Sequence, residues 1–399
     1  MRIVYAWNYL EWGGAQVYFL QLMKEAKKHH EVLAVMPEGS DLQLLKVLDE
    51  LEVRCEMIKS HADTKPAFGV LRKIERHLNK LKSEFDFYRF LTKKVSEDTI
   101  FHVDFGVWQS FLFLWFLSGK APVFFTIHNP VTGHQWWRDW LWKIKFRILG
   151  NRKNFHFFAS NENAREFLAK YLPRKVLDTV KITYSGVDLE EISSVVGANF
   201  EEFYEKFGIP RDKFLVFCVG QFIDRKGRWE FLGAAEEVLD SSDSRDAFFV
   251  WLSNSKLSDE DRERIEKFRV GESFKLISSE LIGDRRNYLR LLSLADLFVL
   301  PSHVEGLPIA VLEAMALGKA VVSTRINAIP EAVKHGETGW LIEPKNSEQL
   351  AQAIKALKAD DSMRRKLGEN ARNFVQEKFD SKKIARIALL SYEEALLKR

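Results

Sequence analysis

Short apolar runs alternate with longer helical patterns along the whole chain, and this alternation restricts the fold more than any other feature. The first half has six strand-like runs, at residues 2–6, 31–36, 99–103, 123–127, 155–159 and 180–184. The second half repeats the pattern at residues 214–219, 247–252, 274–277, 297–300, 320–323 and 339–342. Nearly continuous apolar strands separated by helical segments are typical of βαβ units wound on a parallel sheet. The sequence therefore predicts an α/β protein.

The length of the chain predicts two domains. Its 399 residues exceed the size of one ordinary core, and two domains of roughly 200 residues fit better. Two successive strand sets predict two Rossmann-like, doubly wound domains that bind ligand in a cleft facing the carboxyl ends of their strands. We expect them at residues 1–190 and 191–380. A last helical segment, 381–399, is expected to pack back toward the first domain.

The composition excludes several classes of protein. Sixty Lys and Arg against 56 Asp and Glu leave a net charge of +4, too little to suggest a nucleic-acid partner. Two distant cysteines, Cys55 and Cys218, suit a reducing compartment and predict buried thiols without chemistry. The chain begins with a strand pattern instead of a secretory signal, so we expect a cytoplasmic protein. The apolar run 111–117 is too short to span a bilayer and predicts a buried helix.

Residues 295–313 carry the strongest functional signal, because a strand, a turn and a helix start follow one another there. Pro308 suits the first helical turn, and Gly306 lets backbone approach a ligand. The N–H groups of residues 306–310 would then form an anion site at the helix N-terminus. Glu305 and Glu313 add two carboxylates, which accept strong hydrogen bonds from sugar hydroxyls. Taken singly, each is more simply a solvated acid, but Glu313 stands in an otherwise apolar helix where an unpaired carboxylate is costly.

A second signal follows the first strand of the second half. Arg225 and Lys226 stand in a short loop directly after an apolar strand. Positive charge directed at a departing diphosphate is among the largest contributions available to a transferase. The competing interpretation is a solvated turn, and for this loop alone it is the better one.

Two weaker signals lie in the first half. Gly13 and Gly14 separate the first strand from the first helix, where glycines permit backbone contact with phosphate. His128 stands at the end of a predicted strand, and a ligand would bind at the carboxyl ends of the strands. A lone histidine is usually structural, and a turn with two glycines is common.

Together these residues resemble the retaining family-4 glycosyltransferases of the GT-B fold, over nearly the whole chain and in the expected order. The centre of the resemblance is the acidic pair Glu305 and Glu313, which is separated by seven residues. The surrounding text also matches, namely Pro301-Ser302, Glu305-Gly306-Leu307-Pro308, Glu313-Ala314-Met315-Ala316, Gly318-Lys319-Ala320-Val321-Val322, Ile329-Pro330-Glu331-Ala332-Val333 and Gly336-Glu337-Thr338-Gly339.

The resemblance implies roles for the residues of the second half. Glu313 would bind the donor ribose, and Glu305 would lie beside the transferred sugar. The backbone of Gly306, Leu307 and Pro308 would meet the sugar and the diphosphate.

Further roles follow from the same resemblance. Lys226 matches the lysine that neutralises the diphosphate, Gly13 and Gly14 match the glycine loop of the first domain, and His128 matches the histidine beside the sugar.

One departure from the family pattern concerns charge. The family usually has an arginine after the glycine that ends the first strand of the second domain, and this chain has the neutral Gln221. We expect Arg225 to supply the missing charge.

The expected reaction is transfer of a hexosyl-type sugar from a UDP- or GDP-type nucleotide sugar to a saccharide or lipid-linked acceptor, with retention of configuration. Such a reaction belongs to glycolipid or cell-surface polysaccharide synthesis. We expect no further cofactor, and no metal, because no Asp-x-Asp pair stands in a suitable setting. The alternatives are an epimerase or phosphorylase of the same fold, and a non-catalytic sugar-binding subunit, which Gln221 keeps open.

Two basic, aromatic-rich segments of the first domain suggest contact with an anionic membrane at its cytoplasmic face. Residues 71–94 hold eight Lys or Arg against three acids, with apolar residues at helical spacing from Leu71 to Phe85. Residues 136–158 hold six basic residues, one acid and four tryptophans. Such segments suit a helix lying on anionic lipid. The competing interpretation, with nearly equal weight, is that the apolar residues are core and the lysines merely solvated.

Overall fold

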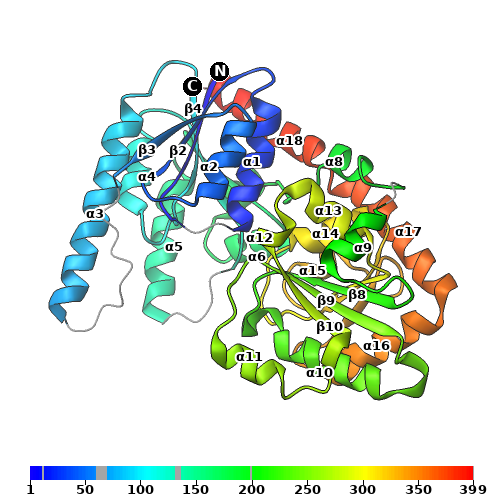
Figure 1. Cartoon of the computed structure of the whole chain (residues 1–399). Coiled ribbons are helices and arrows are strands. Elements are labelled where there is room, and N and C mark those ends of the chain that lie inside the picture. Colours follow the sequence, from blue (N-terminus) through cyan, green and yellow to red (C-terminus); the bar gives the residue numbers. More distant parts are fainter. Residues whose placement is uncertain (11–12, 60–69, 131–135, 198–199, 399) are drawn as a thin grey trace. The chain divides into compact units, whose positions relative to one another are not determined.

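The computed structural model describes residues 1–10, 13–59, 70–130, 136–197 and 200–398. The chain forms two compact units, each built on its own sheet (Figure 1). Unit 1 comprises Met1–Ser185 with Lys382–Arg399, and unit 2 comprises Gly186–Ser381. The sequence placed the first boundary at 190/191 and the second at 380/381, within a few residues of these positions.

Unit 1 is an α/β unit. Its strands are β1 Arg2–Trp7, β2 Glu31–Pro37, β3 Arg54–Ile58, β4 Thr99–Asp104, β5 Val123–Ile127, β6 Phe155–Ala159 and β7 Lys181–Ile182. Its helices are α1 Gly14–Ala26, α2 Leu42–Glu50, α3 Val70–Thr92, α4 Phe111–Leu117, α5 Trp136–Gly150, α6 Glu162–Ala169, α7 Arg174–Leu177 and α18 Ser381–Leu397.

Unit 2 repeats this organisation. Its strands are β8 Phe214–Val219, β9 Ala247–Ser253, β10 Phe274–Ser278, β11 Leu297–Leu300, β12 Ala320–Thr324 and β13 Trp340–Ile342. Its helices are α8 Leu189–Ser193, α9 Glu201–Phe207, α10 Arg228–Asp240, α11 Asp259–Ile265, α12 Ser279–Ile282, α13 Arg285–Ser293, α14 Ile309–Ala316, α15 Ile329–Ala332, α16 Ser347–Ala359 and α17 Asp361–Lys378. Its short 3-10 helices, among the residues that the structure describes, are η1 Asp224–Lys226, η2 Ser242–Ser244 and η3 Gly271–Ser273.

The two sheets share one strand order. Among the described residues, unit 1 has the order β3-β2-β1-β4-β5-β6-β7 and unit 2 the order β10-β9-β8-β11-β12-β13, with every paired strand parallel. In both sheets, the second and third strands are added on one side of the first strand, and the fourth strand is added on the other side of the first strand. The strand order therefore reverses between β1 and β4 in unit 1, and between β8 and β11 in unit 2. Open α/β sheets bind ligands at this reversal point, outside the carboxyl ends of the strands.

The sheet of unit 1 is buried on both faces, because successive side chains of a strand point to opposite sides. In β1, Val4 and Ala6 face one apolar cluster with α3, α4 and α5. Tyr5 and Trp7 face the other, with α1 and α2. Burial on both faces explains why the strands are almost continuously apolar in sequence.

The C-terminal helix α18 completes the second of these clusters. Its Ala385, Ala388 and Tyr392 are fully buried there beside α1. The Tyr392 hydroxyl lies 2.6 Å from Nδ1 of His102 on β4, and Nε2 of His102 lies 2.7 Å from the Thr126 hydroxyl. This chain of hydrogen bonds joins the last helix of the protein to the centre of its first sheet.

Three elements differ from the sequence prediction. Strand β3 was not predicted, because Arg54–Ile58 is a half-polar edge strand without an apolar run. The predicted strand 180–184 is shortened to β7, Lys181–Ile182. The run 111–117 does form a helix, α4, but it is not wholly buried, since Leu112 is 60% and Phe116 50% exposed. In the described part of the chain, no helix combines the length and apolar character needed to cross a membrane.

Buried histidines make the stability of this protein depend on pH. Burial lowers the pKa of His102 well below its usual value, and it also lowers the pKa of His128 and brings that of His156 to about 4. In the unfolded chain these groups bind protons near pH 6.5, so below this pH the unfolded state binds more protons than the folded state. We expect the free energy of unfolding to fall between pH 7 and pH 5, by up to about 1.4 kcal/mol per pH unit for each such histidine.

Urea unfolding of the full chain at several pH values measures this slope. His102→Gln is expected to reduce it, whereas His29→Gln, at an exposed histidine, leaves it unchanged. Equal slopes in all three proteins would contradict the assignment of His102 as a buried neutral group.

Candidate functional site

In unit 2, the loops that follow β8 and β11 meet at the point where the strand order reverses. The N–H of His303 donates to the carbonyl of Arg225 at 2.8 Å, which ties one loop to the other. Gly227 has a φ of +75°, and a Cβ atom there would lie 2.0 Å from the carbonyl oxygen of Pro301. Only glycine permits this backbone approach. The approach sets the position of Lys226, the residue before it.

Lys226 and Glu305 form an ion pair across these two loops, and their side chains are only 14% and 9% exposed. Ser302 donates to Oε1 of Glu305 at 2.9 Å, and Asn327 donates to its main-chain oxygen at 2.5 Å. The Arg225 guanidinium lies 3.8 Å from Oε2 of Glu305. Two cations and one carboxylate thus gather at the reversal point, as the separate sequence signals suggested.

Glu313 lies on α14 with its own partners. Tyr288 donates to Oε2 at 2.7 Å, and Nη2 of Arg285 lies 2.5 Å from Oε1. Burial raises the pKa of Tyr288 well above its usual value, and the charge of Glu313 raises it further. Burial alone would lower the pKa of Arg285, but Glu313 raises it above the usual value. The Glu313 carboxylate lies in an otherwise apolar helix, and Arg285 and Tyr288 of α13 supply its charge partner and its hydrogen bond.

Cys218 lies in β8, close to its carboxyl end. Burial raises the pKa of the Cys218 thiol well above its usual value, and the charges of Lys226 and Glu305 act on it in opposite directions. The same thiol is among the groups that influence the pKa of Tyr288. Cys218 is fully buried, as predicted, while Cys55 is only partly buried.

Gly306, Leu307 and Pro308 form the turn between Glu305 and α14. The helix begins at Ile309, so Pro308 is the capping residue rather than part of the first turn. Among the described residues, no side chain caps the helix, and its first turn holds no acidic residue. The N-terminus of a helix attracts anions, and here it is not already occupied by a carboxylate of its own.

In unit 1, the sequence-predicted residues line one cavity of about 580 Å³. Gly13, Gly14 and His128 are brought together there from the segments that follow β1 and β5. Gln16 accepts from the N–H of Gly13 at 2.8 Å and holds the glycine turn. The other lining residues are Tyr9, Ala15, Asp104, Gly106, Trp108, Phe125, Thr126, Ile127, Asn129 and Pro130.

His128 is a neutral group in this cavity. Burial lowers the pKa of its imidazole, although the charge of Asp104 opposes the shift. Its Nε2 is buried and has no hydrogen-bond partner among the described residues. Buried polar atoms are nearly always hydrogen-bonded, so an unpartnered one beside a cavity indicates a place for a ligand.

Asp104 is a further candidate site residue, which was not predicted from the sequence. It ends β4, on the other side of the reversal point from the glycine turn, and accepts from the Tyr9 hydroxyl at 2.5 Å. Burial and the charge of Asp104 raise the pKa of Tyr9 well above its usual value. A carboxylate at the end of a central parallel strand was the available signal.

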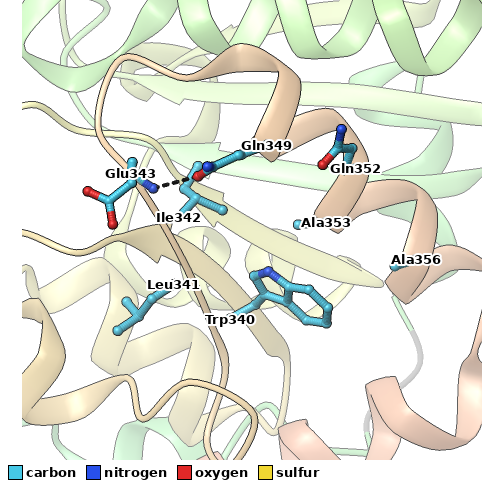
Figure 2. Close-up of a pocket in the computed structure, with 8 residues that line it drawn as sticks. All are labelled: Trp340, Leu341, Ile342, Glu343, Gln349, Gln352, Ala353 and Ala356. Carbon is cyan, nitrogen blue, oxygen red and sulfur yellow. Dashed lines mark hydrogen bonds between the residues drawn. The ribbon is translucent and has the colours of Figure 1, made fainter.

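A second cavity, of about 420 Å³, lies beside the edge strand β13 and α16 (Figure 2). Trp340, Gln352 and Ala353 line it, and the N–H of Glu343 donates to Gln349 at 2.9 Å (Figure 2). None of the predicted site residues lies there, so it is separate from both clusters described above.

Two family models match the chain and together span most of it. "Glycosyltransferase Family 4" matches residues 12–191, and "Glycosyl transferases group 1" matches residues 199–374. The chain belongs to glycosyltransferase family 4. The N-terminal match covers most of unit 1 and the other covers most of unit 2.

Curated relatives match parts of this family-4 chain. It is 42% identical over 104 residues to the N-acetyl-alpha-D-glucosaminyl L-malate synthase of Bacillus anthracis, covering 26% of the chain and 27% of that protein. It is 26% identical over 258 residues to the N,N'-diacetylbacillosaminyl-diphospho-undecaprenol alpha-1,3-N-acetylgalactosaminyltransferase of Campylobacter jejuni, covering 64% and 63%. It is 28% identical to the UDP-Gal:alpha-D-GlcNAc-diphosphoundecaprenol alpha-1,3-galactosyltransferase of Escherichia coli, covering 51% and 52%. The chain thus spans less than two thirds of the length of these relatives.

Solved structures establish the fold over the full length. A glycosyltransferase from Rickettsia africae aligns with a TM-score of 0.77 at 18% identity, covering 99% of this chain and 98% of that one. Anabaena Alr3699/HepE in complex with UDP and glucose aligns with a TM-score of 0.75 at 16% identity, covering 99% and 100%. The expected GT-B fold class, with two parallel-sheet α/β domains, is confirmed.

Several residues around Glu305 and Glu313 were not predicted as part of the site. Arg285 and Tyr288 hold Glu313, and Asn327 holds the backbone of Glu305. Arg285 is the first residue of α13, where a positive charge is unfavourable with respect to the helix dipole. This unfavourable position was a signal in the sequence that Arg285 pairs with an acidic group. Asn327 has a φ of +42°, but sequence alone does not show such a conformation.

Gly227 provides a test of the contact between the two loops of unit 2. Gly227→Ala is expected to lower the free energy of unfolding by about 3 kcal/mol or more, because its Cβ meets the Pro301 carbonyl. Gly271→Ala is the control, since Gly271 also has a positive φ, of +47°, but nothing lies within 4 Å of its Cβ position. We expect the control to cost only about 1–2 kcal/mol. Equal losses in urea unfolding would show that the two loops do not approach as described.

Proposed function

We propose that this chain is a retaining glycosyltransferase that moves a hexosyl-type sugar from a nucleoside-diphosphate sugar to an acceptor hydroxyl. The observation that carries the proposal is the Lys226–Glu305 ion pair at the reversal point of unit 2, beside a helix N-terminus without a carboxylate cap. A cation and free N–H groups suit a diphosphate, and carboxylates suit sugar and ribose hydroxyls. Membership of family 4 supports the same assignment.

In the proposed reaction, the bond between the anomeric carbon and the diphosphate oxygen breaks while the acceptor oxygen bonds to the same face of that carbon. The departing phosphate takes the proton of the acceptor hydroxyl. Lys226, with Arg225 beside it, stabilises the charge that develops on the diphosphate. Glu305 is held by Ser302 beside the sugar, and Glu313 binds the ribose. This scheme assigns no step to a metal ion, and EDTA is expected to leave the rate unchanged.

In unit 1, we assign Gly13 and Gly14 to close backbone contact with the donor, and the neutral His128 to a hydrogen bond with the transferred sugar. The unpartnered Nε2 of His128 supports this role. Asp104 lines the same cavity and is available for an acceptor hydroxyl.

The names of two relatives support a lipid-linked acceptor. The Campylobacter jejuni and Escherichia coli enzymes are named for substrates carried on undecaprenol diphosphate. We propose a saccharide or lipid-linked saccharide acceptor for this chain too, in glycolipid or cell-surface polysaccharide synthesis, with the protein bound peripherally at the cytoplasmic face of the membrane.

Substitution of the ion pair tests the mechanism. Lys226→Gln and Glu305→Gln are each expected to lower kcat by about 10²–10³, because each removes charge that stabilises the transition state. Lys267→Gln, at an exposed lysine of unit 2, is the control and should retain full activity. Thermal unfolding of each variant, and of the double variant, separates loss of catalysis from loss of fold. Near-normal turnover in both single variants would contradict the proposal.

The assay also distinguishes the alternative functions. A transferase releases nucleoside diphosphate only when acceptor is present. An epimerase converts the donor without acceptor, a phosphorylase requires inorganic phosphate, and a sugar-binding subunit binds nucleotide without turnover.

A thermal-shift panel of UDP, GDP, ADP and their sugars identifies the donor. A ligand that binds the folded state at 100 times its Kd adds about 2.7 kcal/mol of stability. We expect UDP or GDP to raise the Tm. Glu313→Gln is expected to reduce that shift and to raise the donor KM more than it lowers kcat, since it removes a ribose contact present before and during transfer. No shift with any nucleotide would contradict a nucleotide-sugar site.

A further inference from the structure

Exposed apolar side chains gather on three helices of unit 1, which we call the three-helix surface. Of the twenty large hydrophobic residues exposed in the described part of the chain, twelve lie on α3, α4 and α5. They are Ile74, Leu78, Leu81, Phe85, Leu112, Phe116, Trp136, Trp137, Trp140, Leu141, Ile144 and Ile148. Scattered exposed apolar residues are normal, but a concentration of this kind marks an interaction site.

The three helices form one layer, with α4 packed against both of the others. Toward α3, Ser110 donates to Glu84 at 2.6 Å, and the rings of Phe116 and Tyr88 are 6.1 Å apart. Toward α5, Lys145 donates to the carbonyl of Trp108, just before α4, at 2.8 Å. All three helices pack on the same apolar cluster, and α4 contacts both α3 and α5. The exposed residues therefore belong to one outward face.

On α5, the buried and exposed apolar residues form two opposite stripes. Trp142, Phe146 and Leu149 repeat at helical spacing and are buried. Trp140, Ile144 and Ile148 repeat at intervals of four and are 64%, 37% and 42% exposed. With about 3.6 residues per turn, these two sets lie on opposite sides of the helix. Core packing thus accounts for the first stripe and leaves the second unexplained.

Cations border the exposed stripe of α5. Lys143 and Arg147 are spaced by one turn along one edge, and Arg138 and Lys145 lie toward the other. The helix has a single acid, Asp139, which accepts from the Tyr171 hydroxyl at 2.5 Å.

Helix α3 also has an exposed apolar stripe, and its C-terminal half has a buried side opposite to it. Ile74, Leu78, Leu81 and Phe85 are spaced by four, three and four residues and form one exposed stripe. Phe87 and Leu91 are buried in the cluster on its opposite side. The side chains of Leu71 and Lys73, which belong to the basic segment recognised in the sequence, lie outside the described ones.

We propose that the three-helix surface inserts shallowly into an anionic lipid bilayer. The stripes of Trp, Leu, Ile and Phe would enter the interface between headgroups and acyl chains, and the bordering Lys and Arg would contact lipid phosphates. Charge selects this occupant over a second copy of the chain, because two such faces would bring like charges together. The three-helix surface would bring the enzyme close to a lipid-linked acceptor, and this purpose rests on the proposed function. Binding of the surface to the bilayer does not depend on that function.

Co-sedimentation with vesicles tests the surface. The probes are vesicles of phosphatidylcholine alone and of phosphatidylcholine mixed with phosphatidylglycerol. We expect the full chain to bind the mixed vesicles and to dissociate as salt is raised, since exposed charges are screened. The variant Trp140→Gln, Ile144→Gln and Ile148→Gln should bind at least about tenfold more weakly. Leu42→Gln, Leu390→Gln and Leu397→Gln replace exposed apolar residues elsewhere in unit 1 and should bind like the native chain.

A charge variant separates the two contributions. Lys143→Gln with Arg147→Gln should weaken binding to the mixed vesicles and reduce its salt dependence, while the helix keeps its apolar stripe. Native-like binding by both α5 variants would overturn the proposal. So would failure of the native chain to bind any vesicle, and so would a dimer, seen in sedimentation velocity, that the apolar variant abolishes without any vesicle binding.

Two further readouts keep this proposal distinct from the proposed function. The Tm shift caused by nucleotide should be the same in native chain and in both variants, because α5 carries none of the donor residues. Vesicle binding by a chain that transfers no sugar would reject the function and support the surface. Sugar transfer by a chain that binds no vesicle would do the reverse.

Discussion

Successive parallel strands can be joined only by a connection that returns from the carboxyl end of one strand to the amino end of the next. The remaining structure depends on this constraint. All strand ends then point the same way, and the loops that follow them gather along one edge. Where the strand order reverses, the connections after the two neighbouring strands continue toward opposite faces of the sheet, and open α/β sheets bind ligands at this point. The glycine turn and Asp104 follow the two reversal strands of unit 1, and Lys226 and Glu305 follow those of unit 2.

The charges at these positions are already paired within the protein. Glu305 holds Lys226, and Glu313 is held by Arg285 and Tyr288. Burying a single charge is very costly, so each group needs a partner before a ligand arrives. In the proposed reaction, a nucleotide sugar would replace these internal contacts with contacts to its own phosphate and hydroxyl groups.

The apolar residues of α3 and α5 show how a single chain pattern can carry two meanings. When a helix has apolar residues on two sides, its sequence does not show whether both sides pack against the rest of the protein or only one of them does. In sequence, the core and the membrane interpretations therefore had almost equal weight. Packing against the sheet uses Phe87 on α3 and Phe146 on α5, and it leaves Phe85 and Trp140 exposed. The same division corrects the expectation that α4 is wholly buried.

The sequence alone determined the class of fold and most strands, because these depend on local apolar runs. Short motifs such as Glu305-Gly306-Leu307-Pro308 predicted part of the candidate site, but Asp104, Arg285 and Tyr288 belong to no such motif. The edge strand β3 was missed, since a half-polar strand has no apolar run and forms only by pairing with β2. Tertiary structure decided which groups meet: the pairing of Lys226 with Glu305 spans 79 residues, and that of His102 with Tyr392 spans 290. These pairs form because the fold brings together strands and helices that are far apart in the sequence, and no local sequence pattern predicts them.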